Sequence, residues 1–284
     1  MRVGIEKSRN LMTVRLADAV GMKNVVETAK RLGVVDDMPP YLSFALGAGE
    51  TTLLRLTAAY AMLDNGGKRI APTLIDRIQD RHGKTAFRHD ARICNECDGV
   101  RWDGQMVPEV PDTREQATDP ASAYQIVSML EGVVQRGTGR RIASLGRPLA
   151  GKTGTTNDSF DTWFVGFSPD LAVGVFVGFD EPATLGSKET GSSVAAPIFK
   201  AFMKEALENT PAIPFRIPPG IRLVRVSAKT GRPARPGDGQ VIYEAFKPGT
   251  IPTVAIDTYR DGYETSTSTT SAPSGPATGT GGLY

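Results

Sequence analysis

The residues best suited to chemistry are a lysine, a glycine and a run of hydroxyls in the segment LAGKTGTTNDSFDTWFVGF: Lys152, Thr153, Gly154, Thr155 and Thr156. A lysine ammonium supplies fixed positive charge beside an anionic substrate group or a developing oxyanion. A glycine has no side chain, so a substrate backbone can lie against a strand at that position. Threonine hydroxyls can donate to a carboxylate without adding charge. These residue types therefore predict a site that holds an anionic, extended substrate.

A Lys-Thr-Gly triplet alone is a weak signal, because the chain carries a second copy at 229–231. The first copy leads into an apolar run, 164–179, that is interrupted only by Ser-Pro-Asp, which predicts a hairpin of two buried strands. The second copy follows an alternating segment and precedes a Pro/Gly-rich one, which predicts a turn in a peripheral sheet. We therefore place the candidate site at Lys152 and interpret Lys229 as a surface residue.

A second pair of polar residues, Ser8 and Asn10, stands directly before a helical pattern at 11–20. Serine and asparagine are preferred at helix N-caps, so the simplest interpretation is a cap. A side chain at a helix start can also point into a cleft, and the two interpretations are compatible. Our hypothesis is that this helix start and the strand of Lys152 face each other across one groove.

Apolar periodicity and stop signals predict the elements that would position these residues. Helices are expected at 11–20, 22–32, 51–63, 119–134 and 193–207, with Thr51 or Thr52 capping the third and Asp119, followed by Pro120, capping the fourth. A hairpin is expected at 70–80 and 84–87, and a few short strands at 221–256. The proline-rich stretch 211–220 marks a domain edge, and the Ser/Thr/Gly/Pro tail should be disordered.

Composition and charge exclude several classes of function. Lysine plus arginine (33) and aspartate plus glutamate (31) nearly balance, giving a net charge of +2 and no argument for nucleic-acid binding. The longest strongly apolar stretch, 171–179, is too short to span a bilayer. The N-terminus lacks the apolar region of a secretion signal. As given, the chain is therefore expected to carry neither an export signal nor an anchor.

The two cysteines, Cys94 and Cys97, are compatible with three kinds of site. They could be half of a zinc site, a redox pair, or a small disulfide that pins a surface loop. No second Cys pair exists and no βαβ pattern surrounds them, so the loop disulfide is favoured and no metal site is predicted. His82 and His89 are interpreted as ordinary surface residues.

Several segments together resemble one family: EKSRNLMTVRLA, FALGAGETTLLRLTAAYAMLDNGG, EGVVQRGTGRR, LAGKTGTTNDSFDTWFVGFSPDLAVGVFVGFD and AAPIFKAFM. They are similar to the transpeptidase domain of class A penicillin-binding proteins, the bifunctional cell-wall synthases, over about residues 1–260. The resemblance implies an α/β (α+β) fold, an antiparallel sheet flanked by helices. It also implies peptidoglycan stems ending in D-Ala-D-Ala and β-lactams as ligands, with no cofactor.

The resemblance gives each candidate residue a role in serine acyl transfer. Ser8 would help relay a proton to the leaving group, and Lys152 would supply positive potential and organise the relay. Asn10 would hydrogen-bond the substrate peptide. The strand residues would pair with substrate or bind its terminal carboxylate: Thr153 and Gly154 at the strand edge, Thr155 at the carboxylate, and Thr156 as a further candidate there.

The sequence departs from the family at the nucleophile. The family uses S-x-x-K, in which the lysine one helical turn on deprotonates the serine, and no serine of this chain has lysine at that offset. We expect a fragment that lacks the first strands and the nucleophile helix. Met1 would be internal to a longer parent whose anchor and glycosyltransferase domain lie upstream, at the periplasmic face of the inner membrane. The isolated chain should then be inactive.

Two alternatives to the transpeptidase fragment stay open. One is a non-catalytic fragment that binds peptidoglycan stems, and the other is a related D,D-carboxypeptidase or β-lactamase-like enzyme. For the transpeptidase fragment, the expected organisation is a partial transpeptidase domain at 1–210, a strand-rich extension at 211–260 and the tail at 261–284.

Overall fold

The computed structural model describes residues 1–90 and 110–252, together with the isolated positions 92, 94, 101, 103, 104 and 106. The helices are α1 (Arg2–Glu6), α2 (Asn10–Val20), α3 (Met22–Arg31), α4 (Leu53–Asp64), α5 (Pro120–Arg136) and α6 (Ala195–Ala206), with 3-10 turns η1 (Leu42–Leu46), η2 (Arg140–Leu145) and η3 (Asn157–Ser159). The strands are β1 (Arg77–Gln79), β2 (Thr85–Arg88), β3 (Ala150–Thr155), β4 (Thr162–Ser168), β5 (Leu171–Val177), β6 (Arg222–Ser227) and β7 (Val241–Phe246). Every helix predicted from the sequence is present, and α1 is an addition.

The centre of the fold is an antiparallel sheet with the strand order β3-β4-β5. β3 pairs with β4 from Ala150 opposite Phe167 to Thr155 opposite Thr162. β4 and β5 form the predicted hairpin, in which Ser168 pairs with Leu171 next to the turn. β3 has a strand neighbour on one side only within the described residues, so the candidate site lies on an edge strand.

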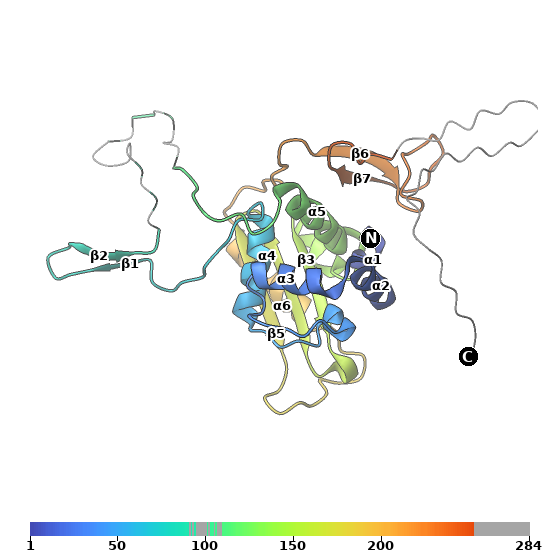
Figure 1. Ribbon diagram of the computed structural model, residues 1–284, viewed down its shortest axis with the longest axis horizontal. Helices are drawn as coiled ribbons and strands as arrows, with labels where there is room; N and C mark the ends of the chain where they lie inside the picture. The colour runs from blue at the N-terminus through green and yellow to red at the C-terminus, as the bar shows by residue number, and fades with distance from the viewer. Residues whose placement is uncertain are drawn as a thin grey trace, which may run out of the picture.

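Helices cover both faces of this sheet (Figure 1). Successive side chains of a strand point to opposite faces, so β4 contributes to two cores. Phe164 packs against Phe199 of α6, with ring centroids 4.7 Å apart. Phe167 points the other way and packs against Tyr60 of α4 and Phe215, at 6.3 and 5.5 Å. Burying each such ring stabilises the fold by about 2–3 kcal/mol, which holds the sheet between α4 and α5 on one face and α6 on the other.

Two of the predicted helix starts are confirmed. The hydroxyl of Thr52 accepts a hydrogen bond from the amide three residues on, at 3.2 Å, and so caps α4. The carboxylate of Asp119 does the same for α5 at 2.9 Å, with Pro120 in the first turn. Each cap satisfies an amide that has no partner within its helix, which is worth about 1 kcal/mol.

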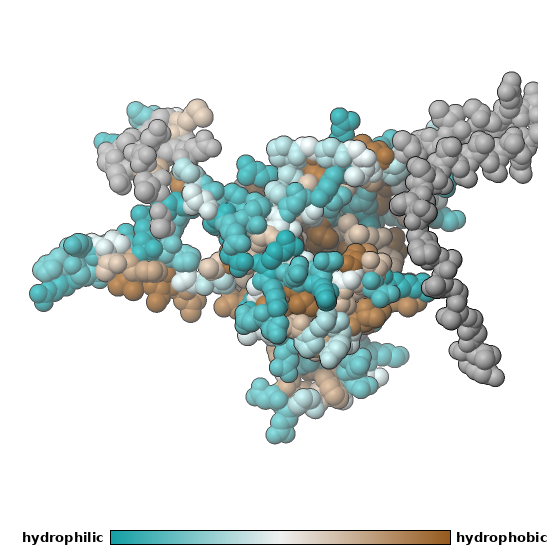
Figure 2. Space-filling model, viewed as in Figure 1, coloured by the Kyte–Doolittle hydropathy of each residue, from teal (hydrophilic) through white to brown (hydrophobic). Residues whose placement is uncertain are grey.

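The β1–β2 hairpin projects away from the body of the molecule (Figure 1). Its first strand begins at Arg77 rather than at Ile70 as predicted, and Pro72, which has no backbone N–H to donate to a ladder, lies in the part that is not a strand. Ile78 and Phe87 face each other across the hairpin and are both about half exposed. Figure 2 shows apolar surface along one side of this arm.

The C-terminal sheet, β6–β7, packs on the outside of α5 (Figure 1). Its anchor in the core is Ala245, which is buried against residues of α5 in the cluster that contains Phe167. Gln125 of α5 donates to the carbonyl of Ala245 at 2.8 Å. Two of the short strands predicted at 221–256 are therefore present as β6 and β7, and residues 253–256 lie outside the described residues. The domain boundaries at 210 and 260 stay predictions.

The predicted disulfide and the predicted tail lie partly or wholly outside the described residues. Cys94 is disulfide-bonded, as the loop interpretation requires, and Cys97 lies outside the described residues. The tail predicted to be disordered, 261–284, also lies outside them. Among the helices of the described residues, none has the length and apolar character needed to cross a membrane.

Candidate functional site

Lys152 and Ser8, which are 144 positions apart in the sequence, meet in the structure. The ammonium of Lys152, in the middle of β3, donates to the hydroxyl of Ser8 at 2.8 Å. It also donates to the carbonyl of Thr153 at 3.0 Å. The helix start and the lysine strand therefore face each other as predicted, and the lysine is held by one side chain and one backbone group.

The backbone explains how Ser8 reaches the lysine. α1 ends at Glu6, and Ser8 takes the left-handed conformation, with φ 51°. The N-cap position of α2 is occupied by Arg9, which makes no side-chain cap bond, so the interpretation of Ser8 as an N-cap is wrong. A non-glycine residue in this region is strained, and such strain often accompanies a functional constraint. The left-handed turn places the hydroxyl of Ser8 next to the ammonium instead of over the helix end.

Burial changes the acid–base behaviour of Lys152. Desolvation of its ammonium lowers the pKa from 10.5 to about 8. The charged form loses hydration that its two hydrogen bonds replace only in part. Near neutral pH the residue is therefore mostly charged, yet it can release its proton within about a unit of physiological pH, which suits both anion binding and proton transfer.

The hydroxyl of Thr153 points to the other side of β3. It shares a hydrogen bond with the hydroxyl of Thr138, 2.8 Å away, in the segment that follows α5. Ser192 in turn donates to the carbonyl of Thr138 at 2.8 Å. Thr153 therefore fixes the strand to the end of α5, and the group it offers to Lys152 is its carbonyl.

The two following threonines have different partners. The hydroxyl of Thr155 accepts from the amide of Gly191 at 3.0 Å, so it ties the loop before α6 to the end of β3. A side chain at position 191 would collide with the backbone of Gly154, which explains the glycine. The hydroxyl of Thr156 accepts from the amide of Asp161 at 2.8 Å and closes the turn before β4.

Asn10 is the first residue of α2 and is exposed. In the described part of the chain its side chain makes no hydrogen bond, which leaves its amide available to a ligand. The hydrogen bond from Lys152 to Ser8 therefore joins the two predicted segments, and Asn10 follows Ser8 by two positions.

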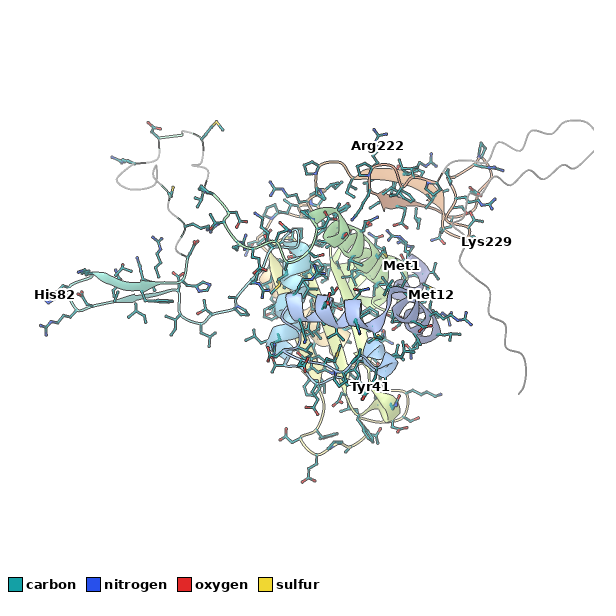
Figure 3. The ribbon with its side chains drawn as sticks, in the orientation of Figure 1. Met1, Met12, Tyr41, His82, Arg222 and Lys229 are labelled. Atoms are coloured by element: carbon teal, nitrogen blue, oxygen red, sulfur yellow. The ribbon has the colours of Figure 1, made fainter. Side chains whose placement is uncertain are left out.

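The second Lys-Thr-Gly copy is a turn, as predicted. Gly231 has φ 71°, and its amide donates back to the carbonyl of Ser227 at 2.8 Å. Figure 3 shows Lys229 at the outer end of the C-terminal sheet and His82 at the tip of the β1–β2 arm. Both side chains are exposed, so neither belongs to the site at Lys152.

A family described as the penicillin binding protein transpeptidase domain matches residues 1–204. The chain belongs to this family. Among curated relatives, penicillin-binding protein 1A of Rickettsia bellii is 47% identical over 249 residues, covering 87% of this chain and 31% of that protein. The protein of the same name from Pseudomonas aeruginosa is 35% identical, covering 87% of this chain and 34% of its own length. This member of the transpeptidase family therefore spans about a third of the curated relatives it matches.

Solved structures of the transpeptidase family agree with the fold. Penicillin-binding protein 1A from Haemophilus influenzae superposes with a TM-score of 0.73 at 32% identity, covering 89% of this chain and 40% of that chain. PonA1 from Mycobacterium tuberculosis, solved in complex with penicillin V, gives 0.61 at 25% identity, covering 77% of this chain and 59% of its own. The mixed α/β fold with an antiparallel sheet flanked by helices is thus confirmed.

The residues that hold β3 and α1 in place were not predicted from the sequence. Thr138 and Gly191 bond to the strand threonines, and Arg2 and Glu244 hold α1, which carries Ser8 at its end. The one signal available for Thr138 was its position between two glycines directly after a helix. Arg2 and Glu244 gave no signal, because a pairing over 242 positions leaves no local pattern.

Proposed function

We propose that this chain forms the substrate-holding wall of a peptidoglycan D,D-transpeptidase domain. The observation that carries the proposal is the 2.8 Å hydrogen bond from the Lys152 ammonium to Ser8 Oγ, on an edge strand, in a chain of this family. An edge strand can accept an extended peptide as a further strand. A lysine and hydroxyls beside that edge suit a peptide that ends in a free carboxylate, such as a stem ending in D-Ala-D-Ala or its β-lactam mimic.

Each residue of the site has a proposed role in this wall. Lys152 attracts the anionic ligand and, through Ser8, passes a proton to the departing D-Ala nitrogen. Thr155 and Thr156 present hydroxyls near the carboxylate end of the ligand. Gly154 keeps the strand edge free of a side chain, and Asn10 binds the peptide from the helix side.

The full reaction needs a nucleophile. A serine attacks the D-Ala-D-Ala carbonyl, D-Ala leaves, and an amine of a neighbouring stem resolves the acyl-enzyme. Because the S-x-x-K pair is absent from the sequence, we propose that the 284-residue chain binds stems and β-lactams without being acylated. Transpeptidation, and the periplasmic face of the inner membrane as its place, belong in this proposal to a complete enzyme of the family.

The test separates binding from acylation. We expect a fluorescent penicillin to leave the purified chain unlabelled after denaturation, and a covalent band would contradict the absence of a nucleophile. In NMR titrations, a peptide ending in D-Ala-D-Ala should shift the amides of Gly154 and Thr155 in a saturable way. Lys152→Gln should abolish these shifts and Lys229→Gln, in the second copy of the motif, should not. If the two variants reduce the amide shifts to the same extent, the proposal is wrong.

A further inference from the structure

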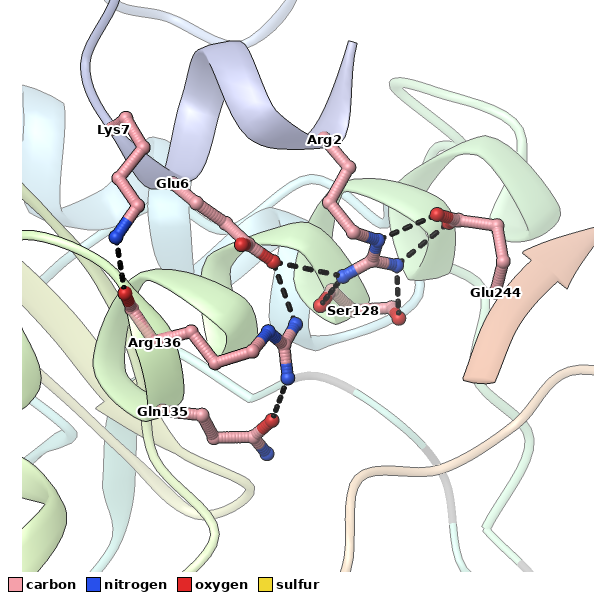
Figure 4. Close-up of polar contacts among 7 residues, drawn as sticks. All are labelled: Arg2, Glu6, Lys7, Ser128, Gln135, Arg136 and Glu244. Atoms are coloured by element: carbon pink, nitrogen blue, oxygen red, sulfur yellow. Dashed lines mark hydrogen bonds and ion pairs between the residues drawn. The ribbon is translucent and has the colours of Figure 1, made fainter. Parts of the chain in front are cut away.

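An ion-pair network behind the site links α1 to the C-terminal sheet (Figure 4). Arg2 is only 7% exposed and donates through two nitrogens to the two carboxylate oxygens of Glu244 in β7, both at 2.6 Å. Its remaining donors reach Ser128 of α5, at 2.7 Å to the carbonyl and 2.9 Å to the hydroxyl. A bidentate pair of this kind fixes orientation as well as distance, so β7 and α5 together determine where α1 begins.

The end of α1 is held just as closely. Glu6, also buried, pairs with Arg136 of α5 at 2.6 Å and lies 3.6 Å from Arg2. The carbonyl of Glu6 accepts from the amide of Thr138 at 3.1 Å, and Lys7 donates to the carbonyl of Arg136 at 2.7 Å. The next residue along the chain is Ser8. The network therefore runs from β7 through α1 to the residue that contacts Lys152.

Two glycines make room for this arrangement. A Cβ on Gly132 of α5 would collide with the carboxylate of Glu6, and a Cβ on Gly137 would collide with its carbonyl. Glycine in a helix interior costs about 1 kcal/mol relative to alanine, so its presence at 132 indicates that the close approach matters more than helix propensity.

We propose that Glu244 is a positioning residue: by holding Arg2, the C-terminal sheet sets the place of α1 and so keeps Ser8 in contact with Lys152. The proposal rests on the proposed function only for the importance of that contact, whereas the coupling itself is a property of the fold. The family match ends at residue 204. The proposal therefore gives β6 and β7, which lie beyond the match, a part in the site.

The charge balance of the network explains why Glu244 matters. The buried Arg2 and the partly buried Arg136 face the carboxylates of Glu6 and Glu244. Burial raises the pKa of the neighbouring Glu131 to about 7, so that carboxyl carries less than a full charge near neutral pH. Without Glu244, one guanidinium lacks its ionic partner, which is costly in a buried setting. Arg2 would then compete with Arg136 for Glu6, and α1 would shift.

The experiment compares two variants of the same C-terminal segment in the complete chain. Glu244→Gln removes the charge opposite Arg2. Lys247→Gln removes the ion pair with Asp119 at the start of α5, at 2.7 Å, which does not involve α1. The titration of the Lys152 side chain is followed by NMR of a ¹³C-labelled lysine ε-carbon, with Lys152→Arg to assign the signal.

In Glu244→Gln, we expect the pH midpoint of the Lys152 titration to rise by about one unit, because a loosened α1 lets water reach the ammonium. The midpoint should not move in Lys247→Gln. Equal shifts, or no shift in Glu244→Gln, would overturn the proposal. Arg2→Gln is the second variant and should reproduce the rise. The thermal midpoint of each variant shows whether the fold is retained. Because the readout needs no ligand, its outcome is independent of whether the chain binds D-Ala-D-Ala peptides.

Discussion

Ser8 combines an uncommon backbone conformation with a close polar contact. It has a left-handed backbone, and its hydroxyl is 2.8 Å from a half-buried ammonium. The left-handed backbone costs free energy, and the same turn is what brings the hydroxyl to the ammonium. At the residue scale, the site is therefore a strained turn that brings a hydroxyl to a lysine of lowered pKa.

The strain can be measured with two variants that both delete the hydroxyl. Ser8→Gly suits the left-handed conformation, whereas Ser8→Ala does not. We expect the glycine variant to be more stable than the alanine variant by about 1 kcal/mol, from urea unfolding curves. An alanine variant of equal or greater stability would show that position 8 is not strained.

The lowered pKa of Lys152 predicts a pH dependence for ligand binding. Below a pH of about 8 the residue is protonated and attracts an anion, and above it the charge is lost. Affinity for an anionic D-Ala-D-Ala peptide should therefore fall as pH rises through about 8, measured by NMR or calorimetric titration. Lys152→Arg keeps its charge throughout this range, so its affinity should stay level. A decline of the same size in that variant would point to another titrating group.

At the scale of elements, the position of α1 on α5 depends on a glycine of α5, which has no side chain to block the approach. Gly132 lies inside α5, about one turn before its end, and the carboxylate of Glu6 occupies the space where its Cβ would be. Close approach of two helices thus takes precedence over helix propensity, and the partly buried ion pair between Glu6 and Arg136 fills the contact.

Gly132→Ala should therefore destabilise the chain. In an exposed helix interior, Gly→Ala raises the free energy of unfolding by about 1 kcal/mol. Here the collision with Glu6 should reverse the sign of that change. We expect a loss of about 1–3 kcal/mol in urea unfolding. Gln135→Ala, at an exposed position of the same helix, removes a side-chain oxygen that accepts from Arg136 but introduces no collision, so it provides the control and should change stability by less than about 0.5 kcal/mol. A stabilised Gly132→Ala would contradict the packing described.

At the scale of the whole molecule, two partly buried carboxyl groups oppose folding at neutral pH. Burial, with the charge of Asp170 nearby, raises the pKa of Asp64 to about 7. Burial alone raises the pKa of Glu131 to about 7, against the nearby arginines. Both groups bind protons more tightly in the folded chain than in the unfolded chain, so they stabilise the fold below their unfolded pKa values, and that contribution is lost as pH rises through about 7.

The free energy of unfolding should therefore decrease between pH 5 and pH 7.5, by an amount on the order of 1–3 kcal/mol for the two groups together. Asp64→Asn and Glu131→Gln should each flatten the profile and raise stability at pH 7.5. Lys152, with its pKa lowered to about 8, is mostly protonated in both states over this range and adds only a small opposing slope near pH 7.5. A stability that increases with pH across this window would show that the two carboxyl groups are better solvated than the structure indicates.

The sequence by itself determined what depends on local pattern. Apolar periodicity, caps such as Thr52 and Asp119, and the Ser-Pro-Asp turn placed the helices and the central hairpin, because each is set by residues a few positions apart. The motif at Lys152 and the family resemblance led to the fold and to the pairing of Ser8 with Lys152. Tertiary structure alone decided that Ser8 is a left-handed turn rather than a cap, that Thr153 and Thr155 bond to Thr138 and Gly191, and that Glu244 holds Arg2. Those contacts join positions far apart in the chain, and long-range packing leaves no trace in local periodicity.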